Sequence, residues 1–226
     1  MIVQAIDGET IARKIQRDDQ FAGARARFSS DCAAALAMIH QLEPSTVDGL
    51  VDTDQVAFYT DVLDALGQPH PTFELVRNWL IANRSERTRT TIVHGDFRLG
   101  NLIVDDGGMR AVIDWELAHL GDPAEDLGWL CVRPWRFGRD HPAVGGLCTR
   151  SRLLELYRDA GGRPVSADQL RYWEIFGNWK WAVICLLQAA SARAGSRPDV
   201  ELAAIGRRVP AVEWELVDLL DREQTQ

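Results

Sequence analysis

One stretch, residues 91–130, constrains the fold of this chain more than any other: TIVHGDFRLGNLIVDDGGMRAVIDWELAHLGDPAEDLGWL. It contains two short apolar runs, Leu102–Val104 and Ala111–Ile113. The segment between them begins with Asp-Asp-Gly-Gly, which indicates a turn because glycine reaches positive φ without steric cost. Two apolar runs joined by such a turn predict a β-hairpin.

Three polar residues stand at the expected open end of this hairpin. Asn101 immediately precedes the first arm, and Asp114 immediately follows the second. A hairpin brings its two ends together, so we expect these two residues to be neighbours in space although they are far apart in sequence. Asp96 lies five residues before Asn101, in the loop that follows the β-prone run Thr91–Val93, and is expected to face the same opening.

This set of residue types suits phosphoryl transfer from a nucleoside triphosphate. The triphosphate arrives with Mg²⁺, which prefers hard oxygen ligands and retains several waters, and an Asp114 carboxylate and an Asn101 amide oxygen are ligands of that kind. A separate carboxylate must orient the attacking hydroxyl and accept its proton. Kinases place an Asp, then an Asn five residues later, then a further Asp for the metal. Here His94-Gly95-Asp96 stands where they carry His-Arg-Asp, and Asp114-Trp115-Glu116 where they carry Asp-Phe-Gly.

The motif HGDFRLGNLI, followed by IDWELAHLGDPAEDLGWL, closely resembles the aminoglycoside phosphotransferase and choline kinase family, which shares the protein-kinase-like fold. More narrowly, it is similar to the branch that includes kinase-like domains fused to acyl-CoA dehydrogenases. The resemblance covers nearly the whole chain. It implies that Asp96 is the catalytic base, that Asn101 and Asp114 are the Mg²⁺ ligands, and that His94 braces the loop rather than touching substrate.

The same resemblance implies a fold and a reaction. The fold is α+β and mostly helical, a protein-kinase-like C-terminal lobe over residues 1–226 in which a small β-hairpin carries the catalytic loop and the metal site. The reaction is transfer of the γ-phosphate of ATP, with Mg²⁺, to a hydroxyl group of a small molecule. The acceptor stays open, because a fold does not fix a substrate. Relatives act on aminoglycosides, choline, sugars and hydroxyacyl compounds, and the acyl-CoA-dehydrogenase branch favours a metabolic role.

Residues 1–10 resemble the hinge strand between the two lobes of such kinases, and backbone groups near Gln4 and Ala5 are expected to meet an adenine ring. The N-terminal lobe, with its phosphate-covering loop and lysine, would precede this strand, and we expect it to be absent. Three explanations stay open: a natural truncation, a misassigned start or shortened chain, and a separate chain that supplies the lobe. An uncovered upper face would drive formation of a homodimer.

The missing lobe also motivates an alternative from another class of function. Positioning of the triphosphate is most of this catalysis, so a chain without the lobe would have weak activity. The alternative is therefore a catalytically weak or inactive kinase-like lobe that binds a ligand or a partner.

Other residues of the motif are predicted to have structural roles. Asp122-Pro123 has the pattern of a helix N-cap followed by proline at the first helical position. Asp126 would then lie in the first turn, where the helix dipole favours a negative charge. His119 is expected to be a local hydrogen-bonding residue rather than a catalyst.

The rest of the chain reads as helical support. Apolar residues recur at helical spacing in several segments, and Pro210 should kink or divide the last of them. The loop 133–146 borders the acceptor pocket in the resembled family, which makes Trp135, Arg136 and Arg139 candidate substrate contacts. The alternative is a packed loop tethered by its aromatic residues. The expected helices span residues 21–39, 54–66, 72–83, 121–131, 150–160, a long helix capped by Ser166, and 199–221.

Composition excludes some classes of function. A net charge of −8 argues against a general nucleic-acid surface, which needs a basic patch. No apolar run reaches the length of a membrane span. The four cysteines form no CxxC pair, so we expect reduced thiols in a cytoplasmic protein rather than a structural zinc site.

Overall fold

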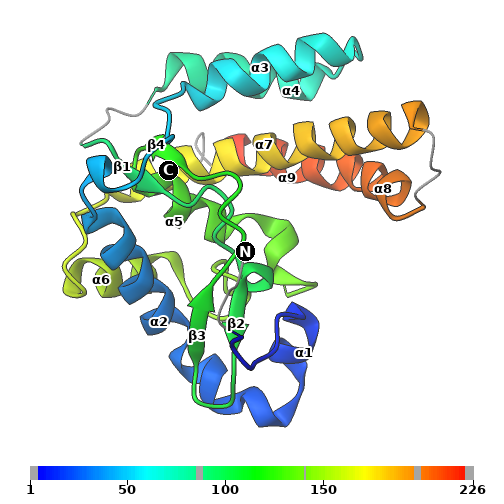
Figure 1. The fold of residues 1–226 in the computed structure, drawn as a ribbon. Helices are drawn as coiled ribbons and strands as arrows, with labels where there is room; N and C mark the ends of the chain where they lie inside the picture. The colour runs from blue at the N-terminus through cyan, green and yellow to red at the C-terminus, as the bar shows by residue number, and fades with distance from the viewer. Residues whose placement is uncertain (1–4, 85–88, 140, 196–199, 222–226) are drawn as a thin grey trace. The chain divides into compact units, whose positions relative to one another are not determined.

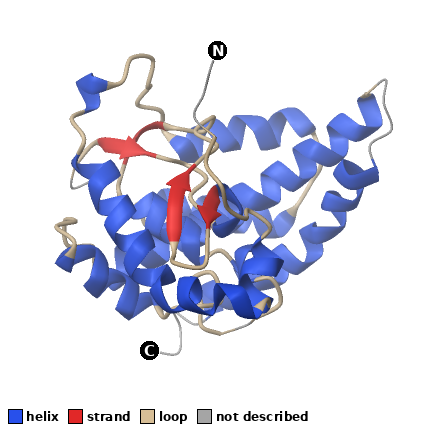
Figure 2. Cartoon of the chain, turned by 60° about the horizontal axis from the view of Figure 1, so that its bottom comes forward, coloured by secondary structure: helices blue, strands red, loops and turns tan. Residues whose placement is uncertain are grey.

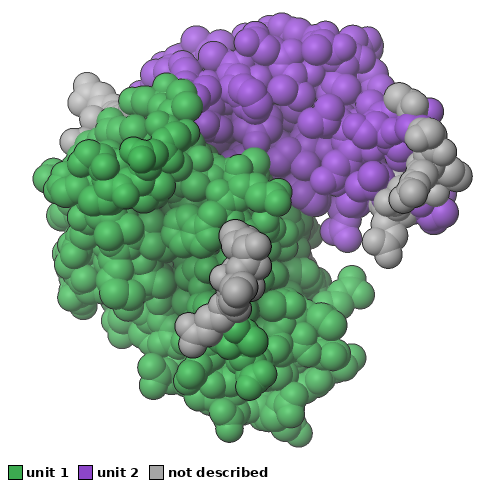
Figure 3. Space-filling view, viewed as in Figure 1, with its two compact units in different colours: residues 1–52, 87–174 green, residues 53–86, 175–226 purple. Residues whose placement is uncertain are grey.

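The computed structural model describes residues 5–84, 89–139, 141–195 and 200–221, and it is mostly helical with two small sheets (Figures 1 and 2). The chain divides into two compact units (Figure 3). Unit 1 comprises residues 1–52 and 87–174, and unit 2 comprises residues 53–86 and 175–226. The predicted site residues that the structure describes all belong to unit 1.

The predicted hairpin is present in unit 1. Strand β2 (Leu102–Val104) pairs antiparallel with β3 (Met109–Val112), with Leu102 opposite Val112. The Asp105 carboxylate accepts the backbone N–H groups of Gly107 and Gly108 at 2.8 and 3.1 Å, which closes the turn. The second arm starts at Met109 rather than at Ala111, so the hairpin is tighter than the sequence predicted.

A second two-stranded sheet fixes the entry to the loop that follows. Strand β1 (Thr91–Val93) pairs antiparallel with β4 (His119–Gly121), with Thr91 opposite Gly121 and Val93 opposite His119. Strand β4 was not predicted, because a three-residue run that ends in glycine carries no period-2 pattern. This pairing brings the start of the HGD loop next to the segment that enters helix α5.

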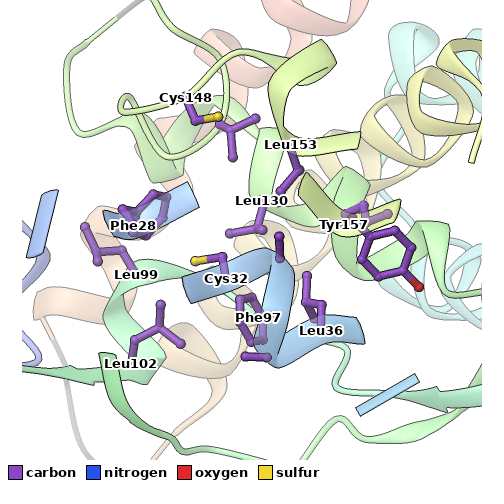
Figure 4. Close-up of a cluster of buried hydrophobic side chains, with 14 of the residues drawn as sticks. Phe28, Cys32, Leu36, Phe97, Leu99, Leu102, Leu130, Cys148, Leu153 and Tyr157 are labelled. Carbon is purple, nitrogen blue, oxygen red and sulfur yellow. The ribbon is translucent and has the colours of Figure 1, made fainter. Parts of the chain in front are cut away.

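Helices and a buried apolar cluster support the loop in unit 1. Helix α2 contacts α6, β1 and β3. Its residues Phe28 and Cys32 pack in one cluster with Phe97 and Leu102, whose segment carries the predicted site (Figure 4). The unit's helices are α1 (Ala12–Arg17), α2 (Ala22–Gln41), α5 (Ala124–Cys131), α6 (Arg150–Asp159) and the first part of α7 (Ala167–Ala194). Helix α1 was not predicted, since six residues are too few to show a period.

Unit 2 consists of helices packed mainly through apolar side chains, and it also buries Asn178, Lys180 and Glu215. Asp54 caps α3 by accepting the N–H groups of Val56 and Ala57, and Gly67 ends the helix at φ +62°. Trp179 is fully buried, and its Nε1 donates to the carbonyl of Phe73 at 3.2 Å. The elements are α3 (Gln55–Leu66), α4 (Pro71–Ala82), the remainder of α7, α8 (Val200–Ile205) and α9 (Val209–Asp221).

The predicted division of the last helix is present. A 3-10 turn at Gly206–Arg208 separates α8 from α9, and Pro210 is the second residue of α9, where a proline is tolerated. Residue 199, the predicted start, lies outside the described residues. No helix within the described ranges has both the length and the apolar character needed to cross a bilayer.

Candidate active site

The loop after β1 is held by a buried carboxylate. The two oxygens of Asp126 accept the backbone N–H groups of His94 and Gly95 at 2.8 and 2.9 Å. The ring Nε2 of His40 lies 3.2 Å from the same carboxylate. Burial alone would raise the pKa of Asp126, but the contact with the His40 ring and the hydrogen bond from the backbone N–H of His94 outweigh it and lower the pKa below the ordinary value for Asp. The carboxylate is thus held in its charged form.

His94 ties the loop to the hairpin. Its ring is fully buried, with Nε2 3.0 Å from the carbonyl oxygen of Ile113. The backbone N–H of Asp96 donates to Nδ1 at 3.2 Å. These two contacts define the neutral tautomer with the proton on Nε2, since Nδ1 must accept. Trp115 packs beside the ring, with centroids 4.5 Å apart. Both ring nitrogens of His94 contact the protein, one in the hairpin and one in the loop, so the ring joins these two segments.

The side chain of Asp96 is held by three residues. Trp129 Nε1 donates to Oδ1 at 2.8 Å, and Asn101 Nδ2 donates to Oδ2 at 2.7 Å. Arg98 Nε lies 3.0 and 3.1 Å from the two oxygens. The Asp96 side chain keeps 14% of its surface exposed, so its carboxylate is oriented by the protein and remains accessible.

Asn101 lies at the base of the hairpin, opposite the residue that precedes Asp114. Asn101 Nδ2 also donates to the backbone carbonyl of Asp96 at 2.9 Å. Both contacts of the amide with Asp96 therefore use its nitrogen, and its oxygen, Oδ1, is the atom that could bind a metal. The carbonyl of Asn101 accepts the N–H of Ile113 at 3.0 Å, and Asp114 is the next residue. The structure therefore brings Asp96 and Asn101 into direct contact and places the backbone of Asp114 beside them.

Asp114 adopts an uncommon backbone conformation. Its φ is +68°, and its side chain is exposed. A non-glycine residue in the left-handed region costs about 1 to 3 kcal/mol and is found preferentially at functional sites. Aspartate is one of the few residues that tolerate this region.

The donor set fits a magnesium ion that is shared with a nucleotide. The protein offers a carboxylate from Asp114 and Oδ1 from Asn101, both hard oxygen donors. Among the described residues no group of three or more His, Cys, Asp or Glu side chains is placed to hold a metal. Mg²⁺ in phosphoryl-transfer sites commonly takes one or two protein ligands and completes its shell with phosphate oxygens and water. Asp114 and Asn101 would supply two such protein ligands.

Two of the predicted substrate contacts have different positions: Trp135 lies near this site, and Arg139 lies at the surface. The ring of Trp135 is buried against Trp129, with centroids 5.3 Å apart, and the guanidinium of Arg98 lies 4.9 Å over it. Arg139 is exposed, and its Nη2 reaches the carbonyl of Gln16 at 3.4 Å. Trp135 thus contacts the residues that hold Asp96, whereas Arg139 faces solvent.

Arg136 has a structural position instead. It is buried, and Nη2 donates to the carbonyl of Cys131 at 2.8 Å and to Glu174 at 3.1 Å. Its Nε donates to the carbonyl of Ala143 at 3.1 Å. A guanidinium engaged in this way holds the loop together, so for Arg136 the structure favours the packed-loop alternative over substrate contact.

The predicted nucleotide contacts lie at the N-terminus. Gln4 lies outside the described residues, and Ala5 is exposed. A few residues further on, Glu9 and Val104 exchange two backbone hydrogen bonds of 2.8 and 3.0 Å. The N-terminal segment is thereby fastened to the edge of β2.

The other polar residues of the motif make local contacts, although the N-cap of α5 is Pro123, one residue after the predicted Asp122. The side chain of Asp122 accepts the N–H of Ala124 at 2.8 Å at the start of α5. His119 contacts the carbonyl of Leu117 and the carboxylate of Glu125, at 2.9 and 3.1 Å. Both are local contacts within the segment that leads into α5.

The structure adds residues that sequence reasoning missed. Arg98 and Trp129 hold the Asp96 carboxylate, and His40 completes the contact to Asp126. Arg98 lies inside the motif, but spacing does not show that its side chain turns back on Asp96. Trp129 and His40 are far from the loop in sequence, and no local pattern connects them to it.

The kinase-like fold and the HGD motif define a class of phosphotransferases. A model of the phosphotransferase enzyme family (APH) matches residues 1–168, and the chain belongs to this family. Acyl-CoA dehydrogenase family member 10 of Mus musculus is 45% identical over 64 residues, which are 27% of this chain and 6% of that protein. The predicted family and its branch are confirmed, and the chain spans only a small part of this curated relative.

Solved structures show the same fold. A Ralstonia eutropha protein assigned to the aminoglycoside phosphotransferases matches with a TM-score of 0.74 at 22% identity, over 97% of this chain and 72% of that one. The GDP complex of aminoglycoside 2'-phosphotransferase-IIIa matches with a TM-score of 0.60 at 11% identity, over 93% and 69%. The predicted mostly helical, kinase-like fold is therefore confirmed.

Proposed function

We propose that this chain catalyses transfer of the γ-phosphoryl group of ATP, held with Mg²⁺, to a hydroxyl group of a small molecule. The observation that carries the proposal is the direct contact between Asp96 and Asn101 at the end of the hairpin from which Asp114 departs. Membership of the phosphotransferase family supports the reaction type. The GDP complex of a protein with this fold supports a nucleotide as donor.

Asp96 is the proposed catalytic base. It accepts a hydrogen bond from the acceptor hydroxyl and then its proton, as that oxygen attacks the γ-phosphorus. Trp129 and Asn101 orient the carboxylate through one N–H each. Arg98 contacts both of its oxygens, so the incoming hydroxyl must share or displace this contact.

Asn101 and Asp114 are the proposed ligands of Mg²⁺, which would neutralise charge on the phosphate oxygens when bound. The two side chains themselves would contribute by holding the ion in position. The backbone hydrogen bond from Ile113 to Asn101 supports this assignment, because it joins the two segments that carry them. His94 and Asp126 act as positioning residues, because they hold the backbone of the loop and not the reactants.

Nucleotide and partner contacts complete the proposal. Backbone groups at Gln4 and Ala5 would meet the adenine ring. An N-terminal lobe, from the same gene or from a separate chain, would cover the phosphates, and an uncovered upper face would favour a homodimer. The proposed acceptor is a small molecule rather than a nucleic acid or a membrane component.

Paired binding and turnover measurements test this proposal. In calorimetry, we expect Asp114→Asn to weaken Mg²⁺-dependent ATP binding about tenfold or more, since it removes the charged metal ligand. Asp96→Asn should keep that binding but lower kcat by about 10²- to 10⁴-fold with any acceptor that is turned over. The matched control is Asp106→Asn, an exposed residue in the turn of the same hairpin.

The pattern of losses separates the two candidate functions. If Asp106→Asn weakens ATP binding as much as Asp114→Asn does, the assignment of the metal ligand is wrong. If the chain binds no nucleotide with Mg²⁺, either alone or extended by an N-terminal lobe, the non-catalytic binding lobe replaces the enzyme.

A further inference from the structure

Unit 1 carries an open hollow of about 420 Å³ that is rich in arginine. This volume lies within the range of small-molecule sites in proteins. Its lining combines four guanidinium groups with one amide and one aromatic ring. The lining residues are Arg13, Gln16, Arg17, Arg25, Phe137 and Arg139. Such a gathering runs against the overall composition, in which 33 acidic residues outnumber 25 basic ones.

Acidic neighbours offset only part of the positive charge of the hollow. Within the described residues, the ion pair formed by these arginines is the 2.9 Å contact between Arg17 and Asp18. Arg25 uses Nη1 on the carbonyls of Ile15 and Asp18, at 2.8 and 2.7 Å. These carbonyls lie at the C-terminal end of α1, where cations are favourable, so Arg25 has a structural role as well. A guanidinium has five N–H donors, and this role engages one nitrogen.

The walls of the hollow are fixed in place. Gln16 is buried, and its Nε2 donates to the carbonyl of Gly145 at 2.7 Å, which fastens α1 to the loop after α5. Arg139, on the same loop, contacts the carbonyl of Gln16 at 3.4 Å. The cations therefore come from three separate segments, α1, α2 and this loop, and their convergence depends on tertiary contacts.

The hollow is connected to the candidate active site by a short length of chain. Trp135 lies under the Arg98 guanidinium that contacts Asp96, and Arg139 follows four residues later. Four residues span about 14 Å at most. The hollow and the residues that hold Asp96 therefore share neighbouring positions of one loop.

We propose that this arginine hollow is a binding subsite for a phosphate group of a small molecule. A phosphate carries nearly two negative charges and several strong acceptor oxygens, and charge-assisted contacts with arginine are its common mode of recognition. A carboxylate is satisfied by one bidentate arginine, whereas four converging guanidinium groups match a phosphate or pyrophosphate. Two sources share this chemistry: the phosphates of the nucleotide, and a phosphate on the acceptor.

The subsite is tested by measuring, with calorimetry, how tightly the full chain binds inorganic pyrophosphate in the absence of Mg²⁺. We expect the double substitution Arg13→Gln with Arg17→Gln to weaken binding about tenfold or more, because both side chains are exposed and each supplies charge. The control is Arg152→Gln with Arg158→Gln, which removes two exposed arginines from α6 outside the hollow. Equal loss in both double variants, or no pyrophosphate binding at all, overturns the proposal.

Two further arms assign the source and separate this proposal from the proposed function. If the hollow variant also loses affinity for ATP with Mg²⁺, the nucleotide supplies the phosphate; if ATP affinity is unchanged, a second small molecule does. Asp96→Asn should bind pyrophosphate as the unchanged chain does. If phosphoryl transfer is never observed but pyrophosphate still binds, the proposed subsite is still supported. If Asp96→Asn loses pyrophosphate binding, the anion binds at the active site, and the proposal that it binds in the hollow is wrong.

Discussion

The loop 94–101 in unit 1 and the helices of unit 2 are held in different ways. The loop is fixed by buried polar groups: the Asp126 carboxylate holds its backbone, and the ring of His94 joins it to the hairpin. In unit 2, α4 and α7 contribute mainly apolar side chains such as Leu80, Trp179 and Phe176, which are fully buried, although α7 and α9 also bury Lys180 and Glu215. Directional bonds fix positions closely, whereas apolar packing fixes shape and tolerates substitutions that keep volume. We infer that substitutions in the first region affect chemistry, and those in the second affect stability alone.

The largest expected effect comes from Asp126→Asn. The substitution keeps the volume but removes the charge that accepts two N–H groups and contacts His40. Breaking a buried charge network costs about 3 to 5 kcal/mol. Urea denaturation should show this loss, and any folded fraction should have lost turnover. Glu155→Gln, at an exposed position on α6, is the control and should change the free energy of unfolding by less than about 0.5 kcal/mol.

Next in size is Leu80→Ala in α4. Leu80 is fully buried, so the truncation leaves a cavity and should cost about 2 to 5 kcal/mol. Leu75→Ala, on the same helix at a position 56% exposed, should cost far less. At a temperature where both variants are folded, kcat should equal that of the unchanged chain. A fall in kcat for Leu80→Ala would break the contrast between the two regions.

Gly95→Ala should have a smaller effect that is confined to the loop. Gly95 has φ +78°, and a β-carbon there would collide with the carbonyl of Leu117. The strained φ costs about 1 to 3 kcal/mol, and the collision adds displacement of the loop. Gly49→Ala separates the cost of the strained φ from the cost of the collision, because Gly49 has φ +86° with open space around it. Thermal unfolding should show a loss in both variants, with turnover reduced only in Gly95→Ala.

The smallest expected effect is a change in acid sensitivity. The pKa of Asp126 is lowered in the folded chain from its ordinary 3.8, so the unfolded chain binds the proton more tightly. The resulting stabilisation is present above about pH 4 and is lost as pH falls through the folded pKa. The difference in unfolding free energy between the unchanged chain and Asp126→Asn should therefore narrow between pH 7 and about pH 3. A constant difference would show that Asp126 does not carry this charge effect.

The two regions also differ in how far the sequence predicted them. The helices of unit 2 were predicted to within a few residues, because Asp54, Gly67 and Pro210 mark boundaries and the apolar spacing marks the buried face. The hairpin was predicted because its turn has an unambiguous composition. These are local signals, and each is complete within a short window.

The site was predicted only in part, and for a physical reason. The approach of Asp96, Asn101 and Asp114 followed from the hairpin, which is a local element. The contacts of Trp129 with Asp96 and of His40 with Asp126 join segments 33 and 86 residues apart, and such contacts leave no trace in spacing. Arg136 was a candidate substrate contact because its loop borders the acceptor pocket in the resembled family, but the backbone carbonyls around it were not visible in the sequence.

The most direct test of the central claim uses Mn²⁺ in place of Mg²⁺, in the presence of ADP, with NMR of the Asn101 side-chain amide. A bound paramagnetic ion broadens the signals of nearby protons. If Asn101 and Asp114 hold the metal, the Asn101 amide protons should broaden beyond detection when Mn²⁺ and ADP are added together, and should persist in Asp114→Asn. A sharp Asn101 signal in the saturated complex, with broadening elsewhere in the chain, would contradict the account.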